Sequence, residues 1–300
     1  MIPQPKNNAP KPPDESAMRL MLENNMADVV QSLIDLHKLQ YKISLREGKW
    51  ILEDSVKGAD LWLKKFITED PDMIRMKDEV KKLAKIDDEV LILGETGTGK
   101  ELIARALIGD REAPFLRINC AAMPKELIES ELFGHKKGAF TGAETDKKGM
   151  MVAAGCGVLF LDEIGDLPLE TQAKILNALQ PVDGKRYVRP VGSNAEIEIG
   201  CRVVCATHRD LKSMVKDGKF RIDLYARIST FELLIKPVRE RKCDIIPIVK
   251  EIGFLIKQES AATRFIEEYM DDIINGEIDL SLNVRSLEQC LKRYAILGRI

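Results

Sequence analysis

Apolar positions in the first part of the chain recur with two different periods. From Glu15 to about Gln40 they follow the spacing of an amphipathic helix, at Met18, Leu22, Met26, Val29, Leu33 and Leu36. The next stretch, YKISLREGKWILE, predicts two short strands around Glu47-Gly48. Residues 1–13 carry five prolines and few apolar side chains, which predicts a disordered tail.

From about residue 70 the pattern changes to short apolar strands that alternate with helices. The predicted strands are 89–93, 115–119, 158–161, 202–206 and 231–235, and the predicted helices are 73–85, 101–107 and 169–179. Strands separated by helices imply crossover connections, and therefore a mostly parallel sheet with helices on both faces. From Cys243 onward the pattern is mostly helical. The sequence thus predicts an α/β core followed by a small α-helical subdomain.

These changes divide the chain into four predicted segments. They are a tail at 1–13, a small N-terminal segment of unknown role at 14–69, the α/β core at 70–236 and the helical subdomain, here called the helical lid, at 237–300.

Composition limits the possible functions of the 300 residues. A formal net charge of -2 gives no sign of non-specific affinity for nucleic acid or an anionic membrane. No apolar run approaches the ~20 residues of a membrane-spanning helix, and the start of the chain lacks the apolar core of a secretory signal. The six cysteines form no CxxC pair, and Cys201 and Cys205 flank a Val-rich run typical of a buried strand. We therefore expect a protein of the reducing cytoplasm.

The segment Gly94-Glu95-Thr96-Gly97-Thr98-Gly99-Lys100 fits the pattern GxxxxGK between a predicted strand and a predicted helix. In that context the glycines let backbone N–H groups cradle phosphate oxygens, and the helix N-terminus adds partial positive charge. Lys100 is placed to reach the β- and γ-phosphates of ATP. We call residues 94–100 the P-loop. The next position, which commonly supplies a Ser or Thr hydroxyl to Mg²⁺, is Glu101.

A second candidate site lies at the end of the apolar run Val158–Leu161. Asp162 and Glu163 follow this run, so both lie at the carboxyl edge of the predicted sheet, where open α/β folds bind ligands. Asp162 would hold Mg²⁺ directly or through water, and Glu163 would polarise the attacking water. An acidic pair about 65 residues after a P-loop indicates a nucleoside triphosphatase.

Two stretches carry a resemblance to a known family. They are GETGTGKELIARALI, which contains the P-loop, and ESELFGHKKGAFTGAE at residues 129–144. Over roughly residues 70–300 the chain resembles the AAA+ domain of bacterial enhancer-binding proteins, the activators of sigma-54 RNA polymerase. That family commonly carries Glu after the P-loop lysine, so the resemblance implies that Glu101 is compatible with hydrolysis.

The most specific match is the hexapeptide Gly138-Ala139-Phe140-Thr141-Gly142-Ala143, here called the interaction loop. The resemblance implies that this loop contacts sigma-54. Its small residues and two glycines suit an exposed tip that changes conformation, and Phe140 supplies an apolar anchor. A flexible surface turn is the alternative for the hexapeptide taken by itself.

Three further residues match the family in the α/β core. The resemblance implies that Asn119 restrains the catalytic Glu until the client engages, and that Thr207, with His208, senses the state of the γ-phosphate. A single histidine is more often structural, so that alternative stays open for His208.

The segment Phe220–Arg227 resembles the arginine-finger segment of the family. Arg221 and Arg227 would then reach the ATP of a neighbouring subunit and stabilise transition-state charge. The alternative is that both arginines only cover the surface of a helix.

The resemblance weakens in the helical lid. Residues 280–289 are LSLNVRSLEQ, where the family has Trp-Pro-Gly-Asn-Val-Arg-Glu-Leu-Glu-Asn. Arg285 is retained as the sensor II arginine, whereas the Trp-Pro-Gly turn and the following Glu are replaced. This departure predicts an altered lid that affects hydrolysis more than nucleotide binding. No helix-turn-helix segment follows the lid in this chain, so we expect no DNA-binding domain within it.

Together these features predict an ATP-driven ring motor, hexameric, that uses ATP and Mg²⁺ to remodel a complex of sigma-54 and RNA polymerase. Two alternatives remain open. One is an AAA+ ATPase that acts on a different client. The other is a nucleotide-dependent interaction protein with impaired hydrolysis, which the altered lid suggests.

Overall fold

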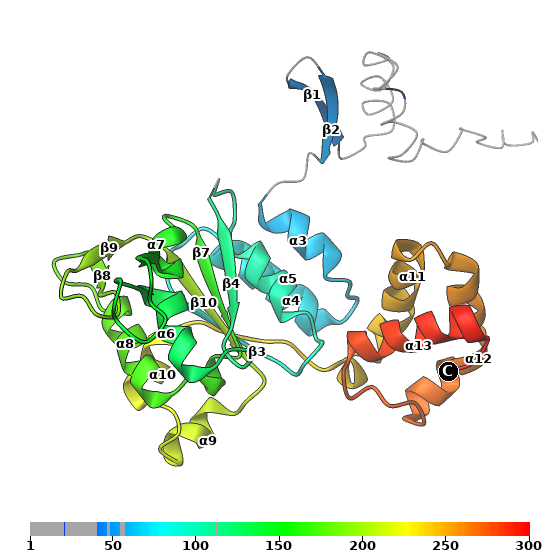
Figure 1. The fold of residues 1–300 in the computed structure, drawn as a ribbon. Helices are drawn as coiled ribbons and strands as arrows, with labels where there is room; N and C mark the ends of the chain where they lie inside the picture. Colours follow the sequence, from blue (N-terminus) through cyan, green and yellow to red (C-terminus); the bar gives the residue numbers. More distant parts are fainter. Residues whose placement is uncertain (1–20, 22–40, 47–48, 55–57, 112) are drawn as a thin grey trace, which may run out of the picture. The chain divides into compact units, whose positions relative to one another are not determined.

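The computed structural model describes residues 21, 41–46, 49–54, 58–111 and 113–300, and the chain forms two compact units, Met1–Lys57 and Gly58–Ile300 (Figure 1). In the first unit, β1 (Tyr41–Arg46) and β2 (Lys49–Asp54) pair antiparallel, which confirms the two predicted strands. Their turn, the predicted tail and the predicted helix, apart from Met21, lie outside the described residues.

The second unit is built on a five-stranded parallel sheet with the strand order β11-β3-β10-β7-β4. Its strands are β3 (Val90–Leu93), β4 (Phe115–Asn119), β7 (Val158–Asp162), β10 (Arg202–Thr207) and β11 (Glu232–Leu234). All five predicted strands are present, within a residue or two at each end, and the predicted α/β fold is confirmed.

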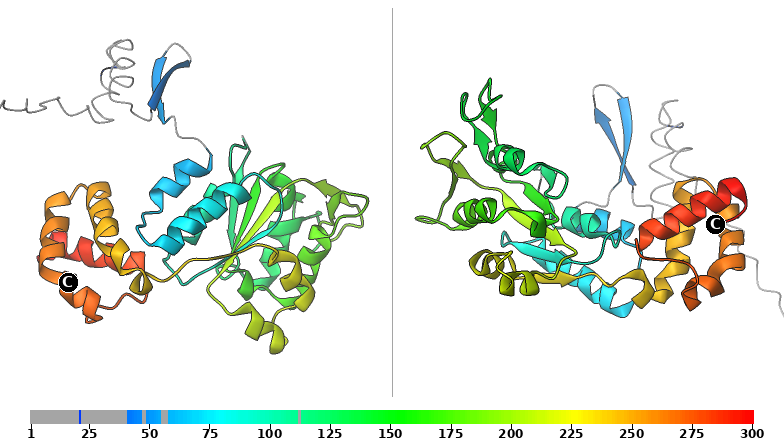
Figure 2. Two further views of the ribbon diagram at one scale, coloured as in Figure 1. Left: turned by 180° about the vertical axis from the view of Figure 1, so that it is seen from behind. Right: turned by 60° about the horizontal axis from the view of Figure 1, so that its bottom comes forward.

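Side chains of successive strand residues enter opposite layers, because residues alternate between the faces of a sheet. One layer holds Val90, Phe160 and Val204 with the apolar sides of α3 (Ala59–Lys65), α4 (Pro71–Leu83) and α5 (Lys100–Ala106). The other layer holds Leu91, Leu159 and Cys205. It is covered by α6 (Lys125–Phe133), α7 (Met150–Ala153), α8 (Leu169–Leu179) and α10 (Ile222–Ile228). Figure 2 shows the sheet between these two groups of helices.

Helix α4 begins two residues before the predicted start at Met73. The carboxylate of Asp70 caps it by accepting hydrogen bonds from the backbone N–H groups of Asp72 and Met73, both at 3.0 Å, and Pro71 occupies the first turn. The preceding helix α3 packs against α5, so residues from Gly58 onward join the compact unit of the sheet. The segment boundaries at residues 13, 69 and 236 stay predictions.

Several small elements extend from the second layer. They are the paired strands β5 (Gly134–His135) and β6 (Lys147–Lys148), the hairpin β8 (Arg186–Val188) and β9 (Ile197–Ile199), the turn η1 (Ile164–Asp166) and helix α9 (Leu211–Lys216). The interaction loop lies between β5 and β6. Cys201 and Cys205 are fully buried, as expected, and burial raises the pKa of the Cys201 thiol to about 11.

The predicted helical subdomain is present, and Figure 1 shows it beside the carboxyl edge of the sheet. It contains α11 (Ile245–Leu255), α12 (Glu259–Asn275) and α13 (Val284–Leu297), preceded by the short turns η2 (Val238–Glu240) and η3 (Lys242–Asp244). These helices bury a separate apolar core around Phe265 and Leu287. Among the described residues, none of the helices has the length and apolar character needed to cross a bilayer.

Candidate functional site

The P-loop joins β3 to α5, as the sequence predicts. Gly97 and Gly99 have φ angles of 78° and 104°, in the left-handed region that favours glycine. A Cβ atom on Gly97 would lie 2.0 Å from the carbonyl oxygen of Leu282 in the lid, so only glycine fits there. Lys100 is buried at the start of α5, and its Nζ donates hydrogen bonds to the carbonyl oxygens of Gly94 at 2.8 Å and Glu95 at 3.2 Å. The side chain of Lys100 therefore turns back onto the P-loop and binds its backbone carbonyls.

The parallel register brings three predicted site residues to one edge of the sheet. Thr207 is aligned with Leu93, the residue before the P-loop, and Asn119 is aligned with Asp162. The strand that carries Thr207 lies between those of the P-loop and Asp162. The carboxyl ends of β3, β10, β7 and β4 therefore bring the P-loop, Thr207, Asp162 and Asn119 to the same edge of the sheet.

Glu101 does not stand free in the position of the Mg²⁺ hydroxyl. Its Oε1 accepts hydrogen bonds from Nε and Nη2 of Arg105 at 3.0 and 2.8 Å, and its Oε2 accepts one from Nη1 of Arg117 at 2.5 Å. The other end of Arg117 donates to Oδ2 of Asp162 at 2.7 Å. Arg105 in turn lies over the ring of Trp62 at 4.9 Å. Glu101 therefore links α5, through Arg117, to Asp162 at the end of β7.

Glu163 has a backbone φ of 56°, which is strained for a residue with a side chain. Its Oε1 lies 3.5 Å from Nζ of Lys100, and its Oε2 accepts hydrogen bonds from Nδ1 of His208 at 2.7 Å and from the His208 backbone N–H at 3.2 Å. Burial favours the neutral acid, but the charge of Lys100 and the bonds from His208 outweigh it and hold the pKa of Glu163 below its ordinary value. The carboxylate form is therefore the resident form at neutral pH.

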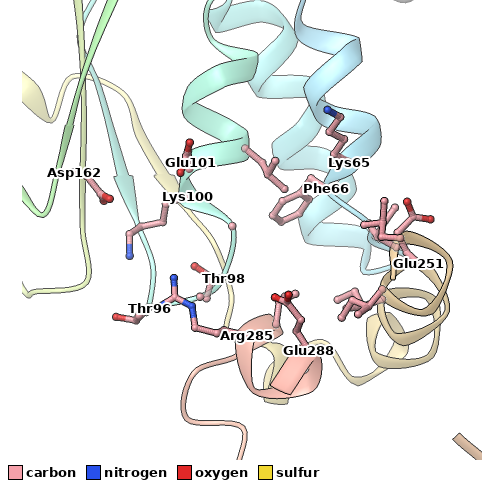
Figure 3. A pocket seen from close by; sticks show the side chains of 18 of the residues that line it. Lys65, Phe66, Thr96, Thr98, Lys100, Glu101, Asp162, Glu251, Arg285 and Glu288 are labelled. Carbon is pink, nitrogen blue, oxygen red and sulfur yellow. The ribbon is translucent and has the colours of Figure 1, made fainter. Parts of the chain in front are cut away.

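A cavity of about 420 Å³ lies beside the P-loop, between the α/β core and the lid (Figure 3). Lys100 and Asp162 line its polar end, and Arg285 extends from α13 toward Thr96. The opposite end is lined mainly by apolar side chains, Phe66, Ile67, Ile248, Ile252 and Leu255, together with the charged side chains of Lys65, Glu251 and Glu288. A polar end for phosphates and an apolar end for a flat ring is the arrangement that a nucleotide needs.

The lid is attached directly to the P-loop. The buried side chain of Asn283 donates to Oε2 of Glu95 at 3.1 Å and to the carbonyl of Thr96 at 3.0 Å, and it accepts a bond from the N–H of Val238 at 2.7 Å. Arg239 makes two further bonds to the Glu95 carboxylate, at 2.7 and 2.5 Å. These bonds hold the pKa of Glu95 below its ordinary value.

The replaced Glu of the lid motif is Ser286. Its Oγ accepts a hydrogen bond from the N–H of Leu282 at 3.1 Å, just before α13 begins. Serine therefore satisfies a backbone donor at the helix start, a role that Glu commonly has three residues after an N-cap. The altered sequence still builds a lid turn that contacts the P-loop, because the N–H of Val284 donates to the carbonyl of Gly97 at 3.2 Å.

A second buried connection joins the lid to the segment before α4. Asp244 is fully buried and accepts bonds from Thr68 Oγ1 at 2.7 Å and from the Glu69 N–H at 2.6 Å. Arg241 donates to Asp244 at 3.1 Å and to the carbonyl of Thr98 at 3.3 Å. The buried ion pair of Arg241 and Asp244 thus connects the lid both to the P-loop and to the segment between α3 and α4.

Among the described hydrogen bonds, the side chains of two other predicted site residues make none to the acids of the cavity. Asn119 lines the cavity, but its amide oxygen accepts the N–H of Ala121 at 2.9 Å, and among the described hydrogen bonds it makes none to Glu163. The Oγ1 of Thr207 accepts the N–H of Arg209 at 3.0 Å. Their roles therefore stay predictions, whereas His208 is the residue that holds Glu163 in this structure.

The two predicted arginine fingers do not line the cavity of their own chain. Arg221 precedes α10 and pairs with Asp223 at 2.7 Å. Arg227 lies in the last turn of α10, with its Nη2 3.4 Å from Oε2 of Glu89, the residue before β3. This is the amino edge of the sheet, opposite the P-loop.

The interaction loop is largely exposed. Cβ atoms on Gly138 and Gly142 would meet nothing within 4 Å, and both glycines have positive φ. The ring of Phe140, which is 36% exposed, packs edge-on against His135 with centroids 5.0 Å apart. The loop thus presents an aromatic side chain on an open, glycine-flanked tip.

Sequence reasoning missed several residues of this site. Arg117 and Phe66 carry no local motif, and only the tertiary structure gives them partners. Asn283 had a signal, because it directly precedes the Val284-Arg285 pair that matches the lid motif.

Within the described residues, no group of three or more His, Cys, Asp or Glu could hold a metal ion alone. Asp162 and Glu163 still fit Mg²⁺, since this ion commonly uses one or two carboxylates together with waters and substrate phosphates.

The parallel sheet, the P-loop at its carboxyl edge and the helical lid bound to that loop define a protein of the AAA+ class. Residues 66–234 match the family described as the Sigma-54 interaction domain. That match covers more than half of the chain, and the chain belongs to this family.

Named relatives agree with this assignment. The chain is 43% identical over 232 residues to the Nif-specific regulatory protein of Azospirillum lipoferum, a match that covers 76% of this chain and 36% of that protein. It is 42% identical over 234 residues to the response regulator protein PilR of Pseudomonas aeruginosa, covering 76% and 51%. The crystal structure of NtrX from Brucella abortus superposes with a TM-score of 0.66 at 25% identity, covering 96% of this chain and 59% of that one. The chain thus spans about a third to a half of the curated relatives it matches.

Proposed function

We propose that this chain binds ATP at the cavity beside the P-loop and hydrolyses it to remodel a sigma-54 RNA polymerase complex. The observation that carries the proposal is the position of Lys100 and Glu163, 3.5 Å apart beside a cavity with one polar and one apolar end. The adenine ring of ATP would lie against Phe66, and its phosphates would lie against the P-loop. A solved structure of NtrX, a similar protein, is described as a complex with ATP, which supports the same ligand here.

Binding of the phosphates would change the partners of Lys100. Its Nζ now donates to two loop carbonyls, and triphosphate oxygens would take their place as stronger, charged acceptors. Mg²⁺, held by Asp162 with phosphate oxygens, would supply electrostatic stabilisation of the transferring phosphoryl group. Arg117 would then release Asp162 and keep its bond to Glu101.

Glu163 would act as the base that orients the attacking water. It is already ionised, and it needs to exchange its contact with His208 or Lys100 for the water. Asn119, on the neighbouring strand, is the natural residue to hold Glu163 during that exchange. Thr207 at the edge of the sheet and Arg285 on the lid would respond to the presence of the γ-phosphate.

Arg221 and Arg227 would act on the ATP of a neighbouring copy in a ring, which we propose to be a hexamer. This requires that a second subunit place its α10 over the cavity. Arginine fingers that act in this way stabilise the charge of the transition state.

The client would be recognised by the interaction loop, residues 138–143. Phe140 packs on His135 in this structure, and its transfer from His135 to a client surface would couple nucleotide state to remodelling. Such coupling requires two conformations of the chain, one for each position of the interaction loop. ATP and ADP must bind to these two conformations with different relative affinity.

The test combines a phosphate-release assay with a binding assay. The wild-type chain should hydrolyse ATP faster per subunit as its concentration rises, and should bind sigma-54 when loaded with a transition-state mimic of ATP. Thr141→Ala should retain hydrolysis and lose the client, whereas the exposed lid variant Thr263→Ala should retain both. Hydrolysis without sigma-54 binding would favour a different client, and nucleotide-dependent binding without hydrolysis would favour an interaction protein.

A further inference from the structure

Glu89 is a buried carboxylate at the amino edge of the sheet, on the side opposite the P-loop. It is only 5% exposed and directly precedes β3. Two arginines from separate elements contact its two oxygens. Nη1 of Arg186, on β8, donates to Oε1 at 2.9 Å, and Nη2 of Arg227, on α10, lies 3.4 Å from Oε2.

The two arginines are held very differently. Arg186 also donates from Nη2 to the carbonyl of Cys201 at 2.8 Å, so its guanidinium is fixed at both ends, and its side chain is 17% exposed. Arg227 has one long contact to Glu89, a side chain that is 39% exposed, and a buried Nε without a partner in the described part of the chain. Arg186 therefore compensates the buried charge of Glu89 firmly, and Arg227 is anchored by one end only.

Because, among the described contacts, only Nη2 of Arg227 reaches Glu89, the guanidinium has a defined orientation, and its other terminal nitrogen is available for another partner. Losing the anchor would let the side chain of Arg227 sample many rotamers, and ordering it again would cost conformational entropy. Glu89 also contacts Arg186 of the β8–β9 hairpin, so a shift of that hairpin would move the carboxylate that holds Arg227.

We propose that Glu89 is a positioning residue for Arg227: it orients the guanidinium at the subunit surface for use on the nucleotide of a neighbouring subunit. This inference rests on the proposed function, in which Arg227 acts in trans. The chemical reason is that a fixed carboxylate behind a guanidinium limits the orientations that the guanidinium can take.

The test compares Glu89→Gln, Arg227→Ala and the double variant in steady-state ATP hydrolysis by the full chain. Glu89→Gln keeps the shape of the side chain but removes its charge. It should lower kcat about tenfold and leave the KM for ATP within about twofold, because misplacement of a catalytic group acts on the transition state. In the Arg227→Ala background the same change should cause no further loss. Glu198→Gln, which removes an exposed ion pair with Lys185 on the same hairpin, is the matched control and should retain wild-type kcat.

Thermal unfolding accompanies each variant, since a merely structural role would lower Tm and add to the loss in the Arg227→Ala background. Additive losses, or an unchanged kcat in folded Glu89→Gln, would overturn the inference. If Glu89→Gln does not fold, Glu89→Asp serves in its place, because it keeps the buried charge and lengthens the 3.4 Å contact to Arg227. Full activity of Arg227→Ala would instead refute the role of Arg227 in the proposed function.

Discussion

Asn283→Ala should separate the lid from the P-loop without unfolding either. In this variant the N–H of Val238 loses its acceptor at 2.7 Å, and Glu95 and Thr96 each lose a donor from the amide. Asn283 is fully buried, so water cannot replace these bonds without entering the lid contact. The backbone at residue 283 also has a φ of 55°, which asparagine tolerates better than alanine.

The size of the effect follows from these losses. An unsatisfied buried donor costs about 1–3 kcal/mol, and each of the other bonds contributes about 1 kcal/mol net. We take a total of about 3 kcal/mol, because such contributions are not fully additive. This corresponds to roughly a hundredfold decrease in the equilibrium constant for docking of the lid. The affinity for ATP should fall by up to the same factor, since the bound nucleotide needs both walls of its cavity.

The assay is a titration of the variant with a fluorescent ATP analogue, accompanied by urea unfolding. Asn275→Ala, at the exposed end of α12 in the same lid, is the control and should bind ATP as the wild type does. The apolar core around Phe265 is unchanged in both variants, so both should fold. If folded Asn283→Ala binds ATP with wild-type affinity, the lid contact does not control the cavity and the reasoning is refuted.

Three further predictions concern the chemistry at the P-loop. Lys100→Ala should abolish ATP binding in the same titration, and an unchanged affinity would refute the assignment of the P-loop. Arg227→Ala and Glu163→Ala should each lose phosphate release, whereas their mixture should regain part of it at mixed interfaces; no recovery would contradict a site shared between subunits. Because the pKa of Glu163 lies below its ordinary value, its base form is present at neutral pH and is lost only as the pH falls through the lowered folded value. His208→Ala removes one contribution that lowers this pKa, so the acid limb of kcat should move to higher pH, and an unmoved limb would exclude His208 as a partner of Glu163.

Much of the fold could be predicted because its signals are local. The runs around Leu91, Phe160 and Val204 are apolar on both sheet faces, and a strand covered by helices on both sides requires that pattern. The P-loop could be found because its glycines and Lys100 are contiguous. Elements of two or three residues, such as β5 and β8, contain too few positions to show a period.

The partners of the site residues could not be predicted, because they come from distant parts of the chain. Asn283 bonds to Glu95 across 188 residues, and Arg239 bonds to it across 144. Glu101 illustrates the same limit. Its position in the motif is the one that commonly supplies a hydroxyl to Mg²⁺, whereas in the structure Arg117 of β4 bonds to both Glu101 and Asp162 and so links the two carboxylates. A local motif predicts the backbone conformation of its own segment, whereas the partners of its charged side chains depend on the tertiary structure.

The topology of the sheet explains why hydrolysis would require a second subunit. Glu89 and Gly94 lie before and after β3, and a strand rises about 3.3 Å per residue, so these two residues are separated by about 16 Å. Arg227 is bound at the Glu89 end, and the phosphates would lie at the Gly94 end. An arginine that is anchored at one edge of the sheet cannot serve a nucleotide at the other edge of the same sheet. If Arg227 acts in hydrolysis, as proposed above, a neighbouring copy has to supply it, and activity per subunit should then rise with protein concentration.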